Sequence, residues 1–408
     1  MNDFAYTAVD SLAGAVEAYS RSPGSMYLAG GTTMVDLLRE GVFAPEAVVD
    51  ISALPWREVR VDGEFTRIGA MVSNSEVAWN PAIKKMFPVV AEAILAGASG
   101  QIRNMASTGG NLLQRTRCPY YRDLTAPCNR RAPGSGCAAL AGINRSHAIL
   151  GGSEACIATH PSDFAVALTA VDARVRVAGS AGERDIPITD FYRQPGRTPE
   201  QETVLQPGEL IAAVLLPHAS AHGRSLYLKV RDRKSYEFAL ASAAVAAELN
   251  DGRWHRVRIA LGGVGTVPWR SRAAEQLLEG ERPRGELFAA AANAELAAAR
   301  PRRLGPPASG PGRRPGASCF RRFSGAFPVL PSPARIPGPA PAPGAPAWAV
   351  SRGARLGPPP CALRPWAMGH GRRALPLTGR MGHNALCICT GDLSAFQLEL
   401  RRRGQPLT

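Results

Sequence analysis

An abrupt change of composition after residue 301 limits which part of this chain can build a hydrophobic core. Of the 35 prolines in the 408 residues, 18 lie in residues 302–408, together with 16 arginines, no lysine and only two acidic residues. That segment has no sustained period of 3.6 or 2, and its composition cannot bury enough apolar surface to offset the entropy of folding. We therefore expect the ordered part of the protein to lie within residues 1–301.

Two explanations of residues 302–408 stay open. A G+C-rich gene read in the wrong frame yields Arg/Pro/Gly/Ala text without lysine, and the switch at "AAARP|RRLGPP" is sharp. The alternative is a native, disordered, Pro-rich extension. The formal net charge of +15 belongs to this segment, because up to Pro301 the 32 basic and 31 acidic residues nearly cancel. The charge therefore does not predict a nucleic-acid partner for the ordered part.

Periodicity in the ordered part predicts short, mixed helices and strands, an α+β class without regular βαβ alternation. Residues 26–51, "MYLAGGTTMVDLLREGVFAPEAVVDI", predict a strand, a glycine turn, a helix and a second strand. Residues 87–99 predict a helix that ends at a glycine. Residues 100–114 have little periodicity and predict a loop with a short strand.

A second domain is expected to begin near residue 222. Before it, a helix is predicted from about Pro161, with Ser162 and Asp163 in its first turn. After it, strands are predicted within residues 225–265, followed by two helices. The N-terminus has no basic start followed by an apolar run, and no stretch approaches the ~20 apolar residues of a membrane span. These observations predict a cytoplasmic chain without membrane insertion.

Two glycine loops, "AGGTT" (29–33) and "STGGN" (107–111), are candidate phosphate-binding sites. In the first, two glycines between a strand and a helix allow a sharp turn and leave amide groups free at a helix N-terminus, which suits a pyrophosphate. Neither loop carries a Walker or GxGxxG motif. Two such loops can clamp one extended ligand from two sides, but the pattern alone leaves ordinary turns equally open.

Four cysteines gather in one Pro/Gly/Arg-rich segment, and the first 300 residues contain no others. The absence of an export signal argues against disulfides, and the close CxxC pairs of structural zinc sites are missing. Four thiolates suit a [4Fe–4S] cluster, although the spacing does not exclude separately buried cysteines. The cysteines are Cys118, Cys128, Cys137 and Cys156. The arginines that either offset a cluster's charge or lie in solvent are Arg117, Arg122, Arg130 and Arg131.

The segments "YLAGGTTMVDLL", "IRNMASTGGNLLQ" and "HPSDFAVAL" together resemble the FAD-binding subunit of the molybdenum hydroxylases, the xanthine dehydrogenase and aldehyde oxidoreductase family. The resemblance runs to about residue 300. It implies a two-part FAD-binding domain of the vanillyl-alcohol-oxidase (PCMH) type in residues 1–220, with a [4Fe–4S] insertion at about 115–157. A small α+β C-terminal domain, truncated if the frame is lost, follows in 222–301, and 302–408 form a disordered or frameshifted tail.

The resemblance also implies site residues. The two glycine loops bind FAD, mainly its pyrophosphate, through Ala29, Gly30, Gly31, Thr32, Thr33, Thr108, Gly110 and Asn111. Asp163, Ile211 and Lys229 match further FAD contacts; an ordinary first-turn acid and an exposed strand lysine are the alternatives for Asp163 and Lys229. The cysteine segment resembles the aldehyde oxidoreductase form of the family, in which the four cysteines hold a [4Fe–4S] cluster. Packing or hydrogen-bonding roles are then expected for His147 and His160.

We therefore expect an FAD and iron–sulfur electron-transfer subunit of a heterotrimeric, molybdenum-dependent aldehyde oxidoreductase. A large subunit with the molybdenum cofactor and a small [2Fe–2S] subunit are the implied partners, and an external acceptor takes the electrons. No catalytic residue is expected in this chain. The alternatives are an aromatic acyl-CoA reductase or xanthine dehydrogenase-type subunit, a stand-alone FAD oxidoreductase, and a nucleic-acid-binding protein that uses the Arg-rich tail. Export to the periplasm is compatible with the sequence if a partner carries the signal.

Overall fold

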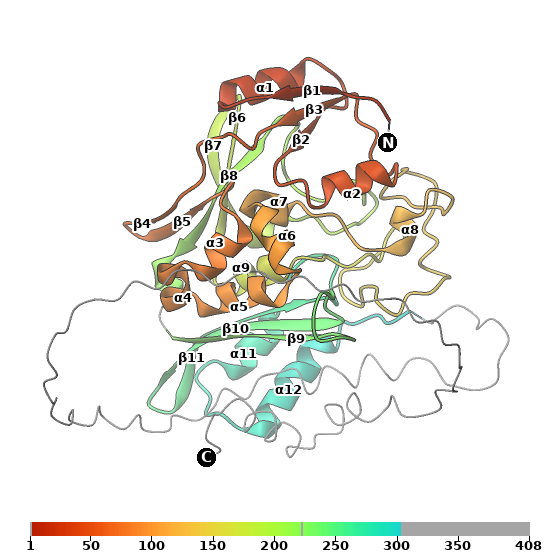
Figure 1. Ribbon diagram of the computed structural model, residues 1–408. Coiled ribbons are helices and arrows are strands. Elements are labelled where there is room, and N and C mark those ends of the chain that lie inside the picture. The colour runs from red at the N-terminus through yellow and green to blue at the C-terminus, as the bar shows by residue number, and fades with distance from the viewer. Residues whose placement is uncertain (1, 222, 303–408) are drawn as a thin grey trace, which may run out of the picture. The chain divides into compact units, whose positions relative to one another are not determined.

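The computed structural model describes residues 2–221 and 223–302, so the expectations for residues beyond Arg302 lie outside the described part. Three sheets and a layer of short helices make up this part, as Figure 1 shows. Helices and strands are mixed along the chain, which confirms the α+β class.

A three-stranded parallel sheet in the order β1-β3-β2 forms from the first 50 residues. Its apolar strand β3 is buried, and Leu37 and Leu38 bury one side of helix α2. The strand, turn, helix and strand predicted for residues 26–51 are therefore confirmed. The elements are β1 (Ala5–Ala8), α1 (Leu12–Ser20), β2 (Met26–Leu28), α2 (Met34–Arg39) and β3 (Ala47–Asp50).

A five-stranded antiparallel sheet in the order β4-β5-β8-β6-β7 follows. Strand β8 lies at its centre and pairs with both β5 and β6, so seven of its eight residues are buried. This pairing brings the end of the first domain back against residues 65–69. The strands are β4 (Val59–Asp62), β5 (Phe65–Gly69), β6 (Arg174–Gly179), β7 (Gly182–Pro187) and β8 (Leu210–Pro217).

Short helices lie next to the five-stranded sheet and correct one prediction. Residues 100–112 form two helices rather than a loop and strand, because Ser99 and Ser107 each cap a helix by accepting a hydrogen bond from a backbone N–H. Ser162 caps α9 in the same way and so lies just before its first turn. The helices are α3 (Asn74–Trp79), α4 (Pro81–Met86), α5 (Pro88–Ala96), α6 (Gly100–Met105), α7 (Thr108–Leu112) and α9 (Asp163–Ala170).

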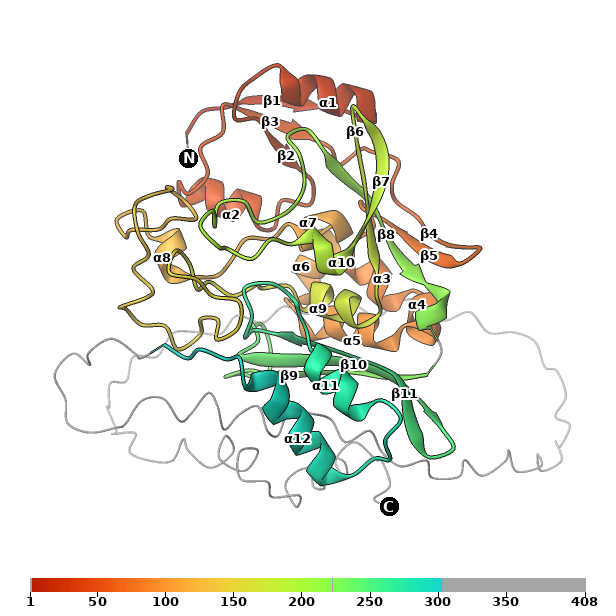
Figure 2. The ribbon, with the colours of Figure 1, turned by 180° about the vertical axis from the view of Figure 1, so that it is seen from behind.

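The C-terminal part is a four-stranded antiparallel sheet in the order β12-β11-β10-β9. Helices α5 and α9 pack on one face of this sheet, and α11 and α12 lie on the other (Figure 2). The elements are β9 (Arg224–Val230), β10 (Ala241–Asn250), β11 (Arg253–Gly262), β12 (Trp269–Arg270), α11 (Arg272–Leu278) and α12 (Gly285–Leu296). Three short turns complete the described chain: α8 (Pro119–Arg122), α10 (Ile188–Phe191) and η1 (His218–Ser220).

Candidate cofactor-binding site

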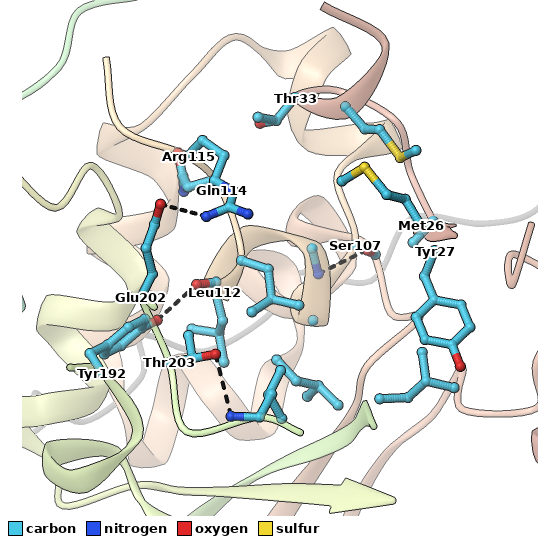
Figure 3. Close-up of a pocket in the computed structure, with 18 of the residues that line it drawn as sticks. Met26, Tyr27, Thr33, Ser107, Leu112, Gln114, Arg115, Tyr192, Glu202 and Thr203 are labelled. Atoms are coloured by element: carbon cyan, nitrogen blue, oxygen red, sulfur yellow. Dashed lines mark hydrogen bonds and ion pairs between the residues drawn. The ribbon is translucent and has the colours of Figure 1, made fainter. Parts of the chain in front are cut away.

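A cavity of about 670 Å³ lies where the parallel sheet, helix α7 and the segment 200–211 meet. Ligand pockets commonly have volumes of about 300–1,000 Å³, so the space suits a large organic molecule. Figure 3 shows Met26 and Tyr27 on one side of it, with Arg115 and Glu202 on the opposite side.

The first glycine loop, residues 29–33, lines the cavity over its whole length. A Cβ on Gly30 would lie 2.0 Å from the carbonyl oxygen of Met105, so the two backbones approach too closely for any other residue. Gly31 has a φ of +71°, which also favours glycine. Within the described chain, the amide N–H groups of residues 30–33 donate to no carbonyl or side chain. These donors are therefore available to an anionic group in the cavity.

The second glycine loop forms helix α7, and its backbone donors are occupied. Gly110 N–H donates to the Ser107 hydroxyl at 3.2 Å, and Gly109 N–H donates to the carbonyl of Ala70 at 2.9 Å. Ser107, Gly109 and Gly110 line the cavity. The loop therefore shapes the wall and offers fewer free donors than residues 29–33.

Two residues of this loop that were expected to contact the cofactor do not line the cavity. Thr108 is fully buried, and its hydroxyl donates to the carbonyl of Val72 at 2.9 Å. The Asn111 Oδ1 accepts hydrogen bonds from the Ser162 hydroxyl at 2.6 Å and from Gln114 at 3.0 Å. Both side chains hold neighbouring segments in place instead.

Asp163 and Lys229 form a buried ion pair away from the cavity. The Lys229 ammonium lies 2.7 Å from the Asp163 carboxylate, and the Tyr227 hydroxyl donates to the same carboxylate at 2.5 Å. Burial, together with the Asp163 charge, raises the pKa of Tyr227 well above its ordinary value. The pair joins α9 to β9, and neither partner lines the cavity. Ile211, on β8, does line it.

Sequence reasoning missed the wall formed by residues 192–207. The Tyr192 hydroxyl donates to the carbonyl of Leu112 at 3.0 Å, and the Glu202 carboxylate accepts from Arg115. On the opposite side, the rings of Tyr19 and Tyr27 stack at 4.7 Å between centroids. No glycine motif or regular spacing marks these residues, so no sequence signal identified them.

The four cysteines line one small cavity of about 10 Å³, which is about the space of a single water molecule. Cys128 and Cys137 pair through their backbones, and the His147 Nε2 lies 3.1 Å from the Cys118 sulfur. Burial raises the pKa of the Cys118 thiol to about 12, although metal ligation requires the thiolate. Within residues 2–221 and 223–302, no group of three or more His, Cys, Asp or Glu is arranged to hold a metal ion. The four cysteines line one cavity, and the cluster predicted at Cys118, Cys128, Cys137 and Cys156 stays a prediction.

Residues 2–219 match the family described as the FAD binding domain in molybdopterin dehydrogenase. The chain belongs to this family of FAD-binding subunits. In this FAD-binding subunit, residues 226–311 also match the CO dehydrogenase flavoprotein C-terminal domain. The first match names FAD binding and the second names a flavoprotein, which confirms the family and the FAD prediction.

Curated relatives support the assignment. The FAD-binding subunit is 49% identical over 283 residues to the aldehyde oxidoreductase FAD-binding subunit PaoB of Escherichia coli, covering 69% of this chain and 87% of that protein. It is 24% identical to the glyceraldehyde dehydrogenase medium chain of Sulfolobus acidocaldarius, covering 70% and 84% of the two chains. These similarities identify the FAD-binding subunit as part of an oxidoreductase.

Solved structures show the same fold. A carbon monoxide dehydrogenase chain from Hydrogenophaga pseudoflava superposes with a TM-score of 0.58 at 24% identity, covering 74% of this chain and 88% of that chain. A chain of CO dehydrogenase from Oligotropha carboxidovorans gives a TM-score of 0.58 at 21% identity, covering 79% and 94%. In the part of the FAD-binding subunit that the structure describes, no helix has the length and apolar character needed to cross a membrane.

Proposed function

We propose that this chain binds FAD and transfers electrons within a molybdenum-dependent aldehyde oxidoreductase. The observation that carries the proposal is the cavity of about 670 Å³, into which a glycine loop with unpaired amide donors faces, in a chain of an FAD-binding family. The relative from Escherichia coli that is 49% identical is an aldehyde oxidoreductase subunit, and this favours an aldehyde as the reductant of the complex.

The residues in the cavity wall fit an FAD molecule. The free amides of residues 30–33 would hold its pyrophosphate, while Gly110 and Ile211 provide a close, apolar surface. Ala29 completes the first loop. Bound FAD supplies the exchange between two-electron and one-electron transfer. The chain itself binds and orients the cofactor and excludes water, and we assign no general acid, base or nucleophile to it.

In this proposal, the other predicted cofactor contacts do not touch FAD and instead hold the residues that line the cavity in place. Thr108 and Asn111 fix helix α7, and the Asp163–Lys229 pair fixes α9 against β9. Their substitution should weaken FAD binding through the shape of the cavity rather than through a lost contact.

A large subunit with a molybdenum cofactor and a small [2Fe–2S] subunit are the proposed partners. The support is that two relatives are named as the medium chains of glyceraldehyde dehydrogenase and carbon monoxide dehydrogenase, and that the matching family is described as the FAD binding domain in molybdopterin dehydrogenase. Domain limits of 1–220 and 222–301, with an insertion at about 115–157, are part of the same proposal.

The iron–sulfur content is a separate, finer proposal: the four cysteines would bind one cluster as thiolates. Its support is that four soft donors from a 39-residue stretch converge on one cavity. We assign no electron-transfer step to this site. Iron and acid-labile sulfide beyond the content of the partner subunits would support the cluster, and their absence in protein purified without oxygen would contradict it.

The function is tested on the native complex purified with its partners. One FAD per chain is expected after acid extraction, and the flavin absorption should bleach when an aldehyde is added without oxygen. A complex without flavin would refute the proposal. Bleaching by a purine but not by aldehydes would assign the subunit to a xanthine dehydrogenase-type complex, and reoxidation of the reduced flavin by an aromatic acyl-CoA would assign it to an acyl-CoA reductase. Turnover by the isolated chain would identify a stand-alone oxidoreductase.

A further inference from the structure

A cluster of three charged side chains lies between the large cavity and the cysteine cavity. Glu202 is paired with two guanidiniums: Arg115 at 2.5 Å and Arg130 at 3.1 Å. All three line the large cavity, and Arg130 lines the cysteine cavity as well. The Arg130 side chain is only 8% exposed. Arg130 therefore lies between the two cavities and contributes to the wall of each.

The three residues come from three different segments. Arg115 follows helix α7, Arg130 belongs to the cysteine segment beside Cys128, and Glu202 lies between α10 and β8. Through Glu202, the insertion is held against the wall of the large cavity. An ion pair in this position fixes the wall because each partner would be costly to leave unpaired when buried.

The charge state of the cluster is well defined. Burial alone would raise the pKa of Glu202, but Arg115 and Arg130 outweigh burial and lower it, so Glu202 is a carboxylate. The cluster therefore carries two positive charges and one negative charge. Burial lowers the pKa of the neighbouring His160 to about 3, and His160 adds no charge at neutral pH.

The Arg130 guanidinium retains an unused donor. Its Nε is buried and has no hydrogen-bond partner among the described residues, while the guanidinium interacts with Glu202 and the Cys156 sulfur. A buried, unpaired N–H next to a cavity is unfavourable unless a ligand accepts its hydrogen bond. This feature, together with the excess positive charge, points to a negatively charged or electron-rich ligand in a cavity that Arg130 lines.

We propose that the Arg115–Glu202–Arg130 cluster is a positioning element that sets the reduction potential of the flavin. The proposal rests on the FAD-binding function proposed above. Reduction adds electrons to the flavin, and a net positive charge beside it favours the electron-rich form, more strongly in a partly buried site than in water. The two arginines should raise the potential, and Glu202 should moderate their effect.

The test measures the flavin reduction potential of the purified holo complex by spectroelectrochemical titration. Arg130→Gln and Arg115→Gln are each expected to lower the potential, whereas Glu202→Gln is expected to raise it. Arg130→Lys, which keeps the charge, should return the potential toward the wild-type value. The matched controls are Arg176→Gln and Asp185→Asn, which break a 2.7 Å ion pair in the β6–β7 hairpin outside the cavity and should leave the potential unchanged.

Opposite shifts from the arginine and glutamate variants support the proposal, because a loosened wall would move all of them in the same direction. Shifts of one sign, or no shift, overturn it. If Arg130→Gln does not retain flavin, Arg115→Gln also removes one positive charge and should likewise lower the reduction potential. A wild-type complex without flavin would refute the FAD-binding function itself and is distinguishable from these outcomes.

Discussion

At the scale of the residue, Gly30 shows how closely the cavity wall is packed. Substitution by alanine places a Cβ 2.0 Å from the Met105 carbonyl oxygen, so one backbone must move. We expect Gly30→Ala to cost about 1–3 kcal/mol of unfolding free energy and to reduce bound FAD severalfold. Gly100→Ala is the control, because its Cβ meets nothing within 4 Å. Equal FAD content in the two variants, measured after extraction, would contradict this role for Gly30.

The burial of His160 allows a prediction of how the free energy of unfolding depends on pH. Its ring packs edge-on against Tyr192 at 4.4 Å, and burial lowers its pKa to about 3, with smaller, opposing effects of Glu202 and Arg130. The unfolded chain has a histidine pKa of about 6.5 and binds a proton that the folded chain excludes. Stability should therefore fall as the pH drops from about 6.5 toward 3, by up to about 1.4 kcal/mol per pH unit from this group.

His160→Gln should reduce that pH dependence. The measurement is urea unfolding of wild type and variant at pH 7.5 and 5.5. His255→Gln, at a partly exposed position, serves as the control and should retain the wild-type difference between the two pH values. An unchanged difference in His160→Gln would show that folding does not lower the pKa of this ring.

At the scale of the element, α2 and α7 show what the sequence can and cannot predict. The helix within residues 26–51 follows from its apolar spacing and its flanking strands, and the structure has it. Helix α7 contains two glycines and only five residues, so propensity argues against it. It forms because its first N–H groups are bonded to Val72 and Ala70, more than 30 residues away in the chain, and local patterns carry no information about such partners.

The expected cofactor-binding residues also fall into two groups: those that a local pattern predicts and those whose position depends on the tertiary fold. The Gly30 loop forms the glycine turn that its pattern predicts, because such a turn after a strand is a local property, and the structure places this turn in the cavity wall. Thr108, Asn111 and Asp163 turn toward protein partners that only the tertiary fold supplies. Glu202 lies in a segment without any motif, and its role depends on arginines 87 and 72 positions earlier in the chain.

The serine caps of α6 and α7 provide a matched pair of elements. Ser99→Ala and Ser107→Ala each remove a hydroxyl that accepts a backbone N–H, at 3.3 Å and 3.2 Å, and each should cost about 1 kcal/mol. Only Ser107 lines the cavity, so only Ser107→Ala should also weaken FAD binding. Thermal unfolding and FAD dissociation constants check this prediction. Equal FAD affinity of the two variants would exclude α7 from the site.

At the scale of the whole molecule, the Asp163–Lys229 pair couples the first domain to the C-terminal sheet. The Lys229 and Asp163 side chains are 4% and 10% exposed, and Tyr227 binds the same carboxylate. Helix α9 packs on β10 and β11, and the pair adds a polar contact from α9 to the neighbouring strand β9. Loss of one partner would leave an uncompensated charge between the two parts.

Lys229→Met should therefore reduce the free energy of unfolding by about 3–5 kcal/mol, because Asp163 stays buried without its cation. The control is Arg21→Met, which breaks a pair with Glu17 whose side chains are 66% and 67% exposed and should cost less than about 1 kcal/mol. Denaturant unfolding measures both values, and FAD content is recorded on the same samples. Loss of FAD with unchanged stability in Lys229→Met would instead make Lys229 a direct cofactor contact. A loss of stability, with FAD released only as the protein unfolds, is the outcome expected of a link between the domains.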